Sequence, residues 1–160
     1  MSWNNLSDRW KEYFIKQLHN TAQMSKDENT KVGSLIIDIE KRVVVSSGWN
    51  DLPVGVKHTT ERNSRPLKYI YTMHSEQNCL INALKLGVNV SNLTMLTTLG
   101  CCPMCCCSIV NSGIKEVVTP TLDYGHISCG ELYKHSEIIL EEGNVVWVFD
   151  DKVKMYEARR

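Results

Sequence analysis

The sequence has 160 residues, of which 42% are hydrophobic and 22% are charged, a composition typical of one globular domain over 1–160. Lysine plus arginine and aspartate plus glutamate each number 18, so the formal net charge is zero, which argues against a nucleic-acid partner held by bulk charge. No apolar run reaches the roughly 18 residues of a membrane span, and the polar start of the chain lacks a secretory-signal pattern, so we expect no membrane partner.

The first half of the chain predicts a helix followed by a β-hairpin. Apolar residues over 8–24 recur at the spacing of an amphipathic helix. A polar turn at 25–30 precedes two β-rich runs, 32–38 and 42–47, which a short charged segment separates. Residues 48–65 are rich in turn-forming side chains, and we expect them to be irregular.

The second half alternates helices with strands. Gly87 and Gly143 are placed to end two of the helices, and Pro103 suits the first position of another. This alternation predicts an α/β fold in which helices cover both faces of a sheet. The expected helices are 75–86, 103–111 and 131–142, and the expected strands are 93–98, 115–119 and 145–149.

Seven cysteines are the unusual feature of the composition. Five of them fall within 101–107, and an odd total cannot pair completely within one chain. We therefore expect a reducing, cytoplasmic setting, where clustered cysteines more often serve metal binding or catalysis than disulfide bonds. Cys102 and Cys105 have the C-x-x-C spacing that lets two sulfurs reach one ion at about 2.3 Å. Redox sites and buried cysteine-rich segments share this spacing, so it does not decide the function alone.

A second motif opens the helix before this pair. His74, Ser75 and Glu76 form an H-x-E triplet, and H-x-E at one helix start with C-x-x-C at the next is the signature of zinc-dependent deaminases. One histidine and two cysteines leave the fourth position of Zn²⁺ open for water, as a catalytic site requires. Glu76 is then placed to move protons to and from that water.

Further segments match one known family in chain order. They are the first helix with its turn (10–37), GWNDLPVGV (48–56), RPLKYIYTMHSEQN (65–78), LGCCPMC (99–105) and NSGIKEVV (111–118). Together they resemble the deoxycytidylate (dCMP) deaminase family of the cytidine deaminase superfamily. The resemblance covers most of the chain.

Four departures from the family pattern leave the metal ligands in place. Ser75 replaces an alanine, Cys101 replaces a proline, and Cys106 and Cys107 replace an alanine-lysine pair. The three cysteines add thiols beside the expected metal. Asp51 replaces the glycine of a GYNG segment, so a charged side chain stands where the family has bare backbone near the nucleotide.

The resemblance implies a three-layer α/β/α sandwich with a five-stranded mixed sheet. It implies that His74, Cys102 and Cys105 hold one Zn²⁺ and that Glu76 is catalytic. The implied reaction is hydrolytic deamination of dCMP to dUMP and ammonia. Family members are often homo-oligomers, commonly hexamers, which dCTP activates and dTTP inhibits, with Mg²⁺ on the effector triphosphate.

Four residues are candidates for substrate binding. Asn50 matches an asparagine that meets substrate near the sugar, although it also fits a turn. The Ser75 backbone N–H is placed for the base carbonyl, and the same residue suits a helix cap. Tyr124 resembles a family tyrosine in the loop after the fourth strand, or is simply a loop aromatic. Lys85 returns to the His74 face of the helix and is a candidate for the phosphate, or is solvated.

A turn and a loop supply the remaining candidates. The resemblance gives Lys26, Asn29 and Lys31 an effector role, against the alternative of a charged surface turn. Further candidates for phosphate contact are Arg62, Arg65 and Lys68.

Four other functions stay open at this point. A tRNA adenosine deaminase shares parts of the motifs, but it spaces the asparagine closer to the histidine. A deaminase of dCTP or deoxycytidine differs only in pocket residues. A non-catalytic zinc-binding module would take a fourth ligand from Cys101, Cys106 or Cys107. A cysteine redox protein would bind no stoichiometric zinc.

Overall fold

A computed structural model of the chain describes residues 1–125 and 129–155. The predicted helices and strands are present, with ends that differ by a few residues, and three short helical elements join them. The elements are η1 (Trp3–Asn5), α1 (Asp8–Ala22), β1 (Gly33–Asp38), β2 (Val43–Trp49), α2 (Lys68–Tyr71), α3 (Ser75–Lys85), β3 (Thr94–Thr97), α4 (Pro103–Ser112), β4 (Glu116–Thr119), α5 (Gly130–Glu142), β5 (Val146–Phe149) and η2 (Asp151–Val153).

The five strands form one mixed sheet in the order β2-β1-β3-β4-β5. β1 runs antiparallel to both β2 and β3, and the predicted hairpin is confirmed by the pairing of Gly33 with Trp49. β3, β4 and β5 run parallel, each joined to the next by a helix, as βαβ crossovers require. The carboxyl end of β3 and the start of α4 therefore lie at one edge of the sheet.

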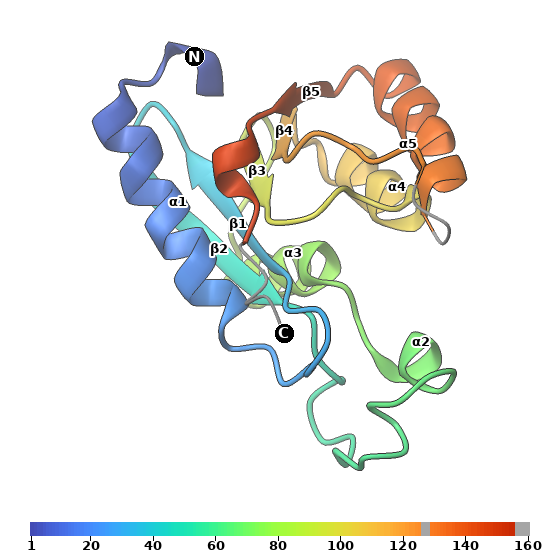
Figure 1. Cartoon of the computed structure of the whole chain (residues 1–160). Helices are drawn as coiled ribbons and strands as arrows, with labels where there is room; N and C mark the ends of the chain where they lie inside the picture. Colours follow the sequence, from blue (N-terminus) through green and yellow to red (C-terminus); the bar gives the residue numbers. More distant parts are fainter. Residues whose placement is uncertain (126–128, 156–160) are drawn as a thin grey trace.

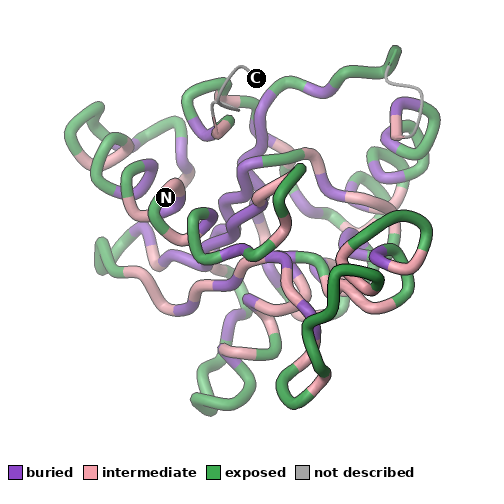
Figure 2. Tube along the Cα trace, turned by 60° about the horizontal axis from the view of Figure 1, so that its bottom comes forward, coloured by how far each residue is buried: buried purple, intermediate pink, exposed green. Residues whose placement is uncertain are grey.

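Helices cover both faces of the sheet, which confirms the three-layer prediction. Ile36, Met95 and Val117 pack on one face against α3, α4 and α5. Neighbouring strand residues, including Leu35 and Val118, face the opposite way and pack against α1 and η1. Figure 1 shows α1 on one side of β1 and β2 and α3 on the other. In Figure 2 the buried stretches of the trace gather in the middle of the molecule.

Side chains fix α3 on the hairpin strand β2. The Ser46 hydroxyl donates to the Cys79 carbonyl oxygen at 2.8 Å, and the Asn78 amide donates to the Trp49 carbonyl oxygen at 2.8 Å. One turn further on, the Asn82 amide donates to the backbone of β2 at 2.9 Å. These bonds attach the middle of α3 to the edge strand β2.

The segment between β2 and α3 is tied down at two points. Asp51 and Met73 form an isolated antiparallel bridge directly before His74. The Lys68 ammonium on α2 lies 2.8 Å from the Asp27 carboxylate, and both side chains are only 10% exposed. The pair joins the 25–30 turn to the segment that leads into α3.

Trp3 anchors the N-terminal segment to the far half of the chain. Trp3 has no exposed surface, its backbone N–H donates to the Glu116 carboxylate at 2.8 Å, and its indole N–H donates to Asp150 at 3.0 Å. Ser2 also donates to Glu116. Among the described residues, none of the helices combines the length and apolar character needed to traverse a bilayer.

Candidate active site

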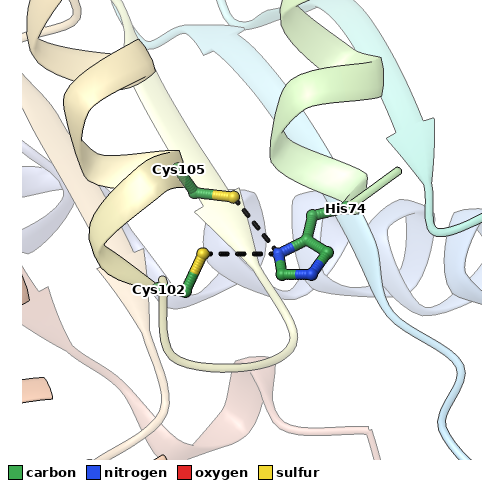
Figure 3. Close-up of side chains that lie close together, drawn as sticks. All are labelled: His74, Cys102 and Cys105. Atoms are coloured by element: carbon green, nitrogen blue, oxygen red, sulfur yellow. Dashed lines mark hydrogen bonds between the residues drawn. The ribbon is translucent and has the colours of Figure 1, made fainter. Parts of the chain in front are cut away.

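Two helix N-termini bring the predicted metal ligands together. His74 is the N-cap residue of α3 and Cys102 is the N-cap residue of α4, each with extended backbone dihedrals. Pro103 occupies the first position of α4, where its missing N–H costs no hydrogen bond, and Cys105 follows within the first turn. Figure 3 shows both sulfurs pointing at the same nitrogen of the His74 ring.

The three ligand atoms lie at distances that suit one ion. The Cys102 and Cys105 sulfurs are each 3.4 Å from His74 Nδ1, and the three ligand atoms lie within 4.8 Å of one another. A sulfur and a nitrogen that bind one tetrahedral Zn²⁺ at about 2.3 and 2.0 Å are about 3.5 Å apart. The donor set and its spacing therefore fit zinc. Burial is graded across the group, because His74 is exposed, Cys102 is half-buried and Cys105 is buried.

Electrostatic interactions within the metal-free group give its three side chains very different pKa values. The hydrogen bond to Cys102 raises the pKa of His74 to about 9, despite the opposing effect of burial. The hydrogen bond from Cys105, followed by that from His74, lowers the pKa of Cys102 to about 4. The bond to Cys102 and burial raise the pKa of the Cys105 thiol. Near neutral pH the group thus holds an imidazolium, a thiolate and a thiol, and a metal ion displaces the protons of His74 and Cys105.

Glu76 lies in the first turn of α3 and is only 4% exposed. Burial raises the pKa of its carboxyl group above the ordinary range, and the nearby His74 charge partly opposes this. A carboxyl group with a raised pKa both accepts and returns a proton readily near neutral pH. The carboxylate also accepts a hydrogen bond from the Ser75 hydroxyl at 3.0 Å.

Comparison with known proteins places these residues in a defined family. Residues 8–121 match the family model described as the cytidine and deoxycytidylate deaminase zinc-binding region. The chain belongs to the cytidine and deoxycytidylate deaminase family. The matched region contains all three residues of the His74, Cys102 and Cys105 group, and it also contains Glu76.

Named relatives and solved structures agree with this family. The deoxycytidylate deaminases of Pongo abelii and Homo sapiens are each 35% identical over 115 residues, which cover 68% of this chain and 63% of each relative. The chain thus spans less than two thirds of the length of these relatives. The crystal structure of the dCMP deaminase from cyanophage S-TIM5, in complex with dCMP and dUMP, superposes with a TM-score of 0.72 at 21% identity and covers 91% of this chain and all of that one. That likeness confirms the cytidine deaminase-like fold.

The additional cysteines do not extend the metal group. In the part of the chain that the structure describes, Cys101, Cys106 and Cys107 are not members of the His74 cluster. Cys101 and Cys106 are buried in the core beneath α4, and Cys107 is exposed on its surface. A closed structural site would need one of these sulfurs as a fourth ligand, so the geometry favours an open, catalytic site in this deaminase family member.

The four predicted substrate residues lie in different settings. Asn50 is buried, and its side-chain amide accepts from the Val32 N–H at 2.8 Å and donates to the Thr30 carbonyl oxygen at 2.9 Å. These bonds give it the turn-stabilising role that the sequence left open. Ser75 lies beside the metal ligands at the first position of α3.

Tyr124 and Lys85 are not brought into contact with the metal group. The Tyr124 hydroxyl donates to the Glu137 carboxylate on α5, and its ring packs edge-on against Tyr133. Lys85 is exposed in the last turn of α3, about 16 Å along the helix axis from the histidine that begins it. Their predicted substrate contacts remain predictions.

The predicted effector residues share one turn at the surface. Lys26 and Asn29 are exposed, and the Lys31 ammonium donates to the Gln23 carbonyl oxygen at 3.5 Å. Lys68, by contrast, is buried and paired with Asp27, so its ammonium is engaged inside the protein.

Sequence reasoning missed two polar residues near the site. The Ser34 hydroxyl on β1 lies 2.7 Å from the Ser75 hydroxyl, and a polar side chain inside a buried strand was the available signal. His58 lies 3.0 Å from the Asp51 carboxylate, which also accepts from the Trp49 indole at 3.3 Å. The charge introduced at Asp51 is therefore held by neighbouring donors.

Proposed function

We propose that this protein is a zinc-dependent hydrolase that deaminates dCMP to dUMP and ammonia. The observation that carries the proposal is the convergence of His74, Cys102 and Cys105 beside the buried Glu76 carboxyl group. Membership of the family and the likeness to deoxycytidylate deaminases support the choice of substrate. His74, Cys102 and Cys105 would hold the ion, which supplies the Lewis acidity that makes water a nucleophile at neutral pH.

The chain's own residues would then carry the protons. Glu76 takes a proton from the water that attacks C4 of cytosine and delivers a proton to N3. It then takes the second proton from the new C4 hydroxyl and gives it to the exocyclic amine, so that the C4–N bond breaks, the C4 carbonyl forms and ammonia leaves. A buried carboxyl group suits this exchange, because burial raises its pKa and so makes it a better proton acceptor than an exposed carboxylate. Ser75 contributes its backbone N–H to the base carbonyl, and Asn50 orders the turn beside the sugar.

Regulation, assembly and location form the finer part of the proposal. Lys26, Asn29 and Lys31 form the effector site for dCTP and dTTP, with Mg²⁺ on the triphosphate, and the exposure of the turn supports this. Homo-oligomers, with the hexamer as the expected form, would cover apolar side chains such as Leu84 and Leu86, which are 76% and 70% exposed. A cytoplasmic location agrees with a composition of seven cysteines, five of them clustered within 101–107, because a reducing compartment keeps clustered thiols available for metal binding.

A substrate panel tests this function directly. Zinc-loaded protein is incubated with deoxycytidine, dCMP, dCTP and a tRNA anticodon stem, with and without added dCTP or dTTP, and ammonia and the base products are measured. We expect dCMP to be deaminated with the highest kcat/KM. A preference for dCTP or deoxycytidine would change the assigned substrate but keep the deamination reaction. Activity on the tRNA stem alone, or on none of the four, would contradict it.

Glu76→Ala provides the mechanistic arm of the same experiment. We expect the variant to keep its zinc and to lose kcat by about 10²- to 10⁴-fold, because no other side chain replaces the proton shuttle. Glu142→Ala, at the exposed end of α5, is the matched control and should retain wild-type turnover. Near-normal turnover by zinc-loaded Glu76→Ala would contradict the role of Glu76.

A further inference from the structure

A buried chain of hydroxyl groups leads from the central sheet to Glu76. The Ser34 hydroxyl on β1 lies 2.7 Å from the Ser75 hydroxyl, which donates to Glu76 Oε2 at 3.0 Å. Ser34 and Ser75 have no exposed surface, and Glu76 is 4% exposed. This series of hydroxyl groups joins β1 to the start of α3, and the core already fixes the relative position of these two elements.

The number of protons sets the direction of this chain. A serine hydroxyl has one proton, and that of Ser75 is given to the Glu76 carboxylate. While Ser75 donates to the ionised carboxylate, its oxygen is free to accept, and the Ser34 hydroxyl is then the donor at the 2.7 Å contact. Both bonds point toward the carboxylate, and aligned hydrogen bonds in a low-dielectric interior strengthen one another.

We propose that Ser75, supported by Ser34, is a positioning residue that fixes the Glu76 carboxyl group for proton transfer. The inference rests on the proposed deaminase function. The bond from Ser75 engages Oε2, which leaves Oε1 as the oxygen that exchanges protons with water and cytosine. A carboxyl group held at one oxygen cannot rotate away from the reacting atoms, and such placement is required for efficient proton transfer.

The structure supplies a matched control for this role. Ser46 is also buried, lies on β2, and donates to the backbone of the same helix, at the Cys79 carbonyl oxygen, 2.8 Å away. It makes no contact with Glu76 that the structure records. Ser46→Ala therefore removes an equivalent strand-to-helix hydrogen bond without touching the carboxyl group.

The test compares the kinetics of Ser75→Ala, Ser34→Ala and Ser46→Ala, each loaded with zinc. The substrate is the cytosine compound that the wild type deaminates best. Ser75→Ala restores the alanine of the family but leaves the buried Ser34 hydroxyl without its acceptor, so we expect it to lower kcat by about 10-fold at most while KM and the Kd for dUMP stay within about twofold of wild type. The solvent deuterium isotope effect on kcat should rise, because proton transfer becomes slower than the other steps. Ser34→Ala should show a smaller loss in kcat, and Ser46→Ala should keep wild-type kcat at a lowered melting temperature.

The double variant tests whether Ser34 acts through Ser75. Ser34→Ala combined with Ser75→Ala should lose no more kcat than Ser75→Ala alone, because the outer donor has no effect once its acceptor is gone. Additive losses in kcat would contradict the proposal that Ser34 acts through Ser75. If Ser75→Ala does not fold, the comparison of Ser34→Ala with Ser46→Ala decides the same question.

Failure of this inference is distinguishable from failure of the proposed function. A zinc-loaded wild-type protein that deaminates no cytosine compound would contradict the function and this inference together. In a second outcome the wild type is active while Ser75→Ala keeps its kcat, or changes only in KM or in zinc content. Either result would overturn the positioning role and leave the function intact.

Discussion

Gly48 of β2 lies so close to Cys79 of α3 that a Cβ atom on Gly48 would stand 2.3 Å from the Cys79 backbone nitrogen. The strand and the helix touch backbone to backbone at this point, which only glycine permits. The contact sets the distance between the sheet and α3, whose N-cap is the proposed metal ligand His74.

Gly48→Ala should therefore destabilise the protein and displace α3. We expect a loss of about 3 kcal/mol, because the clash is with backbone atoms that cannot rotate away, and a melting temperature about 10 °C lower. Differential scanning calorimetry measures the change. Ser47→Ala, at the neighbouring position of β2, adds no atoms and is the control. Equal melting temperatures for the two variants would contradict the close-contact argument.

Zinc content separates the metal ligands from the other cysteines. Cys105→Ser and His74→Ala should reduce bound zinc from one equivalent to less than about 0.1 after dialysis, because a two-ligand site binds zinc weakly. Cys107→Ser, whose exposed sulfur lies outside the ligand group, should keep one equivalent. Plasma emission spectrometry of the dialysed proteins gives the result. Loss of zinc from Cys107→Ser would indicate a different ligand set.

Zinc affinity should increase with pH across the neutral range. Below a pKa of about 9 the metal-free His74 carries a proton, and Cys105 carries one at higher pH still, so both protons leave when zinc binds. Cys102, with a pKa of about 4, is already a thiolate. Release of two protons makes the association constant rise about 100-fold per pH unit.

Competition with a chromophoric chelator between about pH 6 and pH 8 measures that slope. Proton release into a weakly buffered dye solution gives the stoichiometry independently. An affinity that does not change with pH would show that the ligands are deprotonated before the metal arrives.

The Asp27–Lys68 pair should contribute to stability above about pH 4. Burial raises the pKa of Asp27, but the Lys68 hydrogen bond and the Thr30 and Asn29 N–H groups outweigh it, so the pKa lies below its usual value. The folded protein then binds this proton less readily than the unfolded chain does. The stabilisation is present above the unfolded pKa and is lost as pH falls through the folded one.

Asp27→Asn tests this linkage. It leaves the Lys68 ammonium buried without its counter-charge, so we expect a loss of about 3 kcal/mol at pH 7 that shrinks as pH approaches 3. Urea unfolding at several pH values measures it. Glu141→Gln, at an exposed position of α5, is a suitable control, because it removes a carboxylate without leaving a buried ammonium. A loss that is the same at pH 3 and pH 7 would contradict the linkage.

Local patterns in the sequence account for most of the elements and for the metal ligands. The helix over α1 and the β1–β2 hairpin follow from apolar spacing and turn residues, which act within a few positions. His74, Cys102 and Cys105 were identifiable because metal chemistry demands particular side chains at short spacings within each motif. The five-strand mixed sheet was expected from family resemblance, since spacing alone does not choose between strand orders.

Features that depend on distant contacts were not predictable in the same way. The Ser34–Ser75 contact joins positions 41 apart in the sequence. α2 forms a single turn of helix, too short for apolar periodicity to reveal, and Asp27 holds it from an earlier segment. The engagement of the Tyr124 hydroxyl by Glu137 likewise depends on how the segment before α5 packs.

The burial of Trp3 has a consequence for how the chain folds during synthesis. Its backbone and indole bonds reach Glu116 and Asp150, which lie 113 and 147 residues further along. Trp3 therefore acquires these partners only after both of those distant residues have been synthesised. The layer that contains α1 closes only after β5 has been translated, so partially synthesised chains expose the Trp3 indole and the apolar face that it later covers.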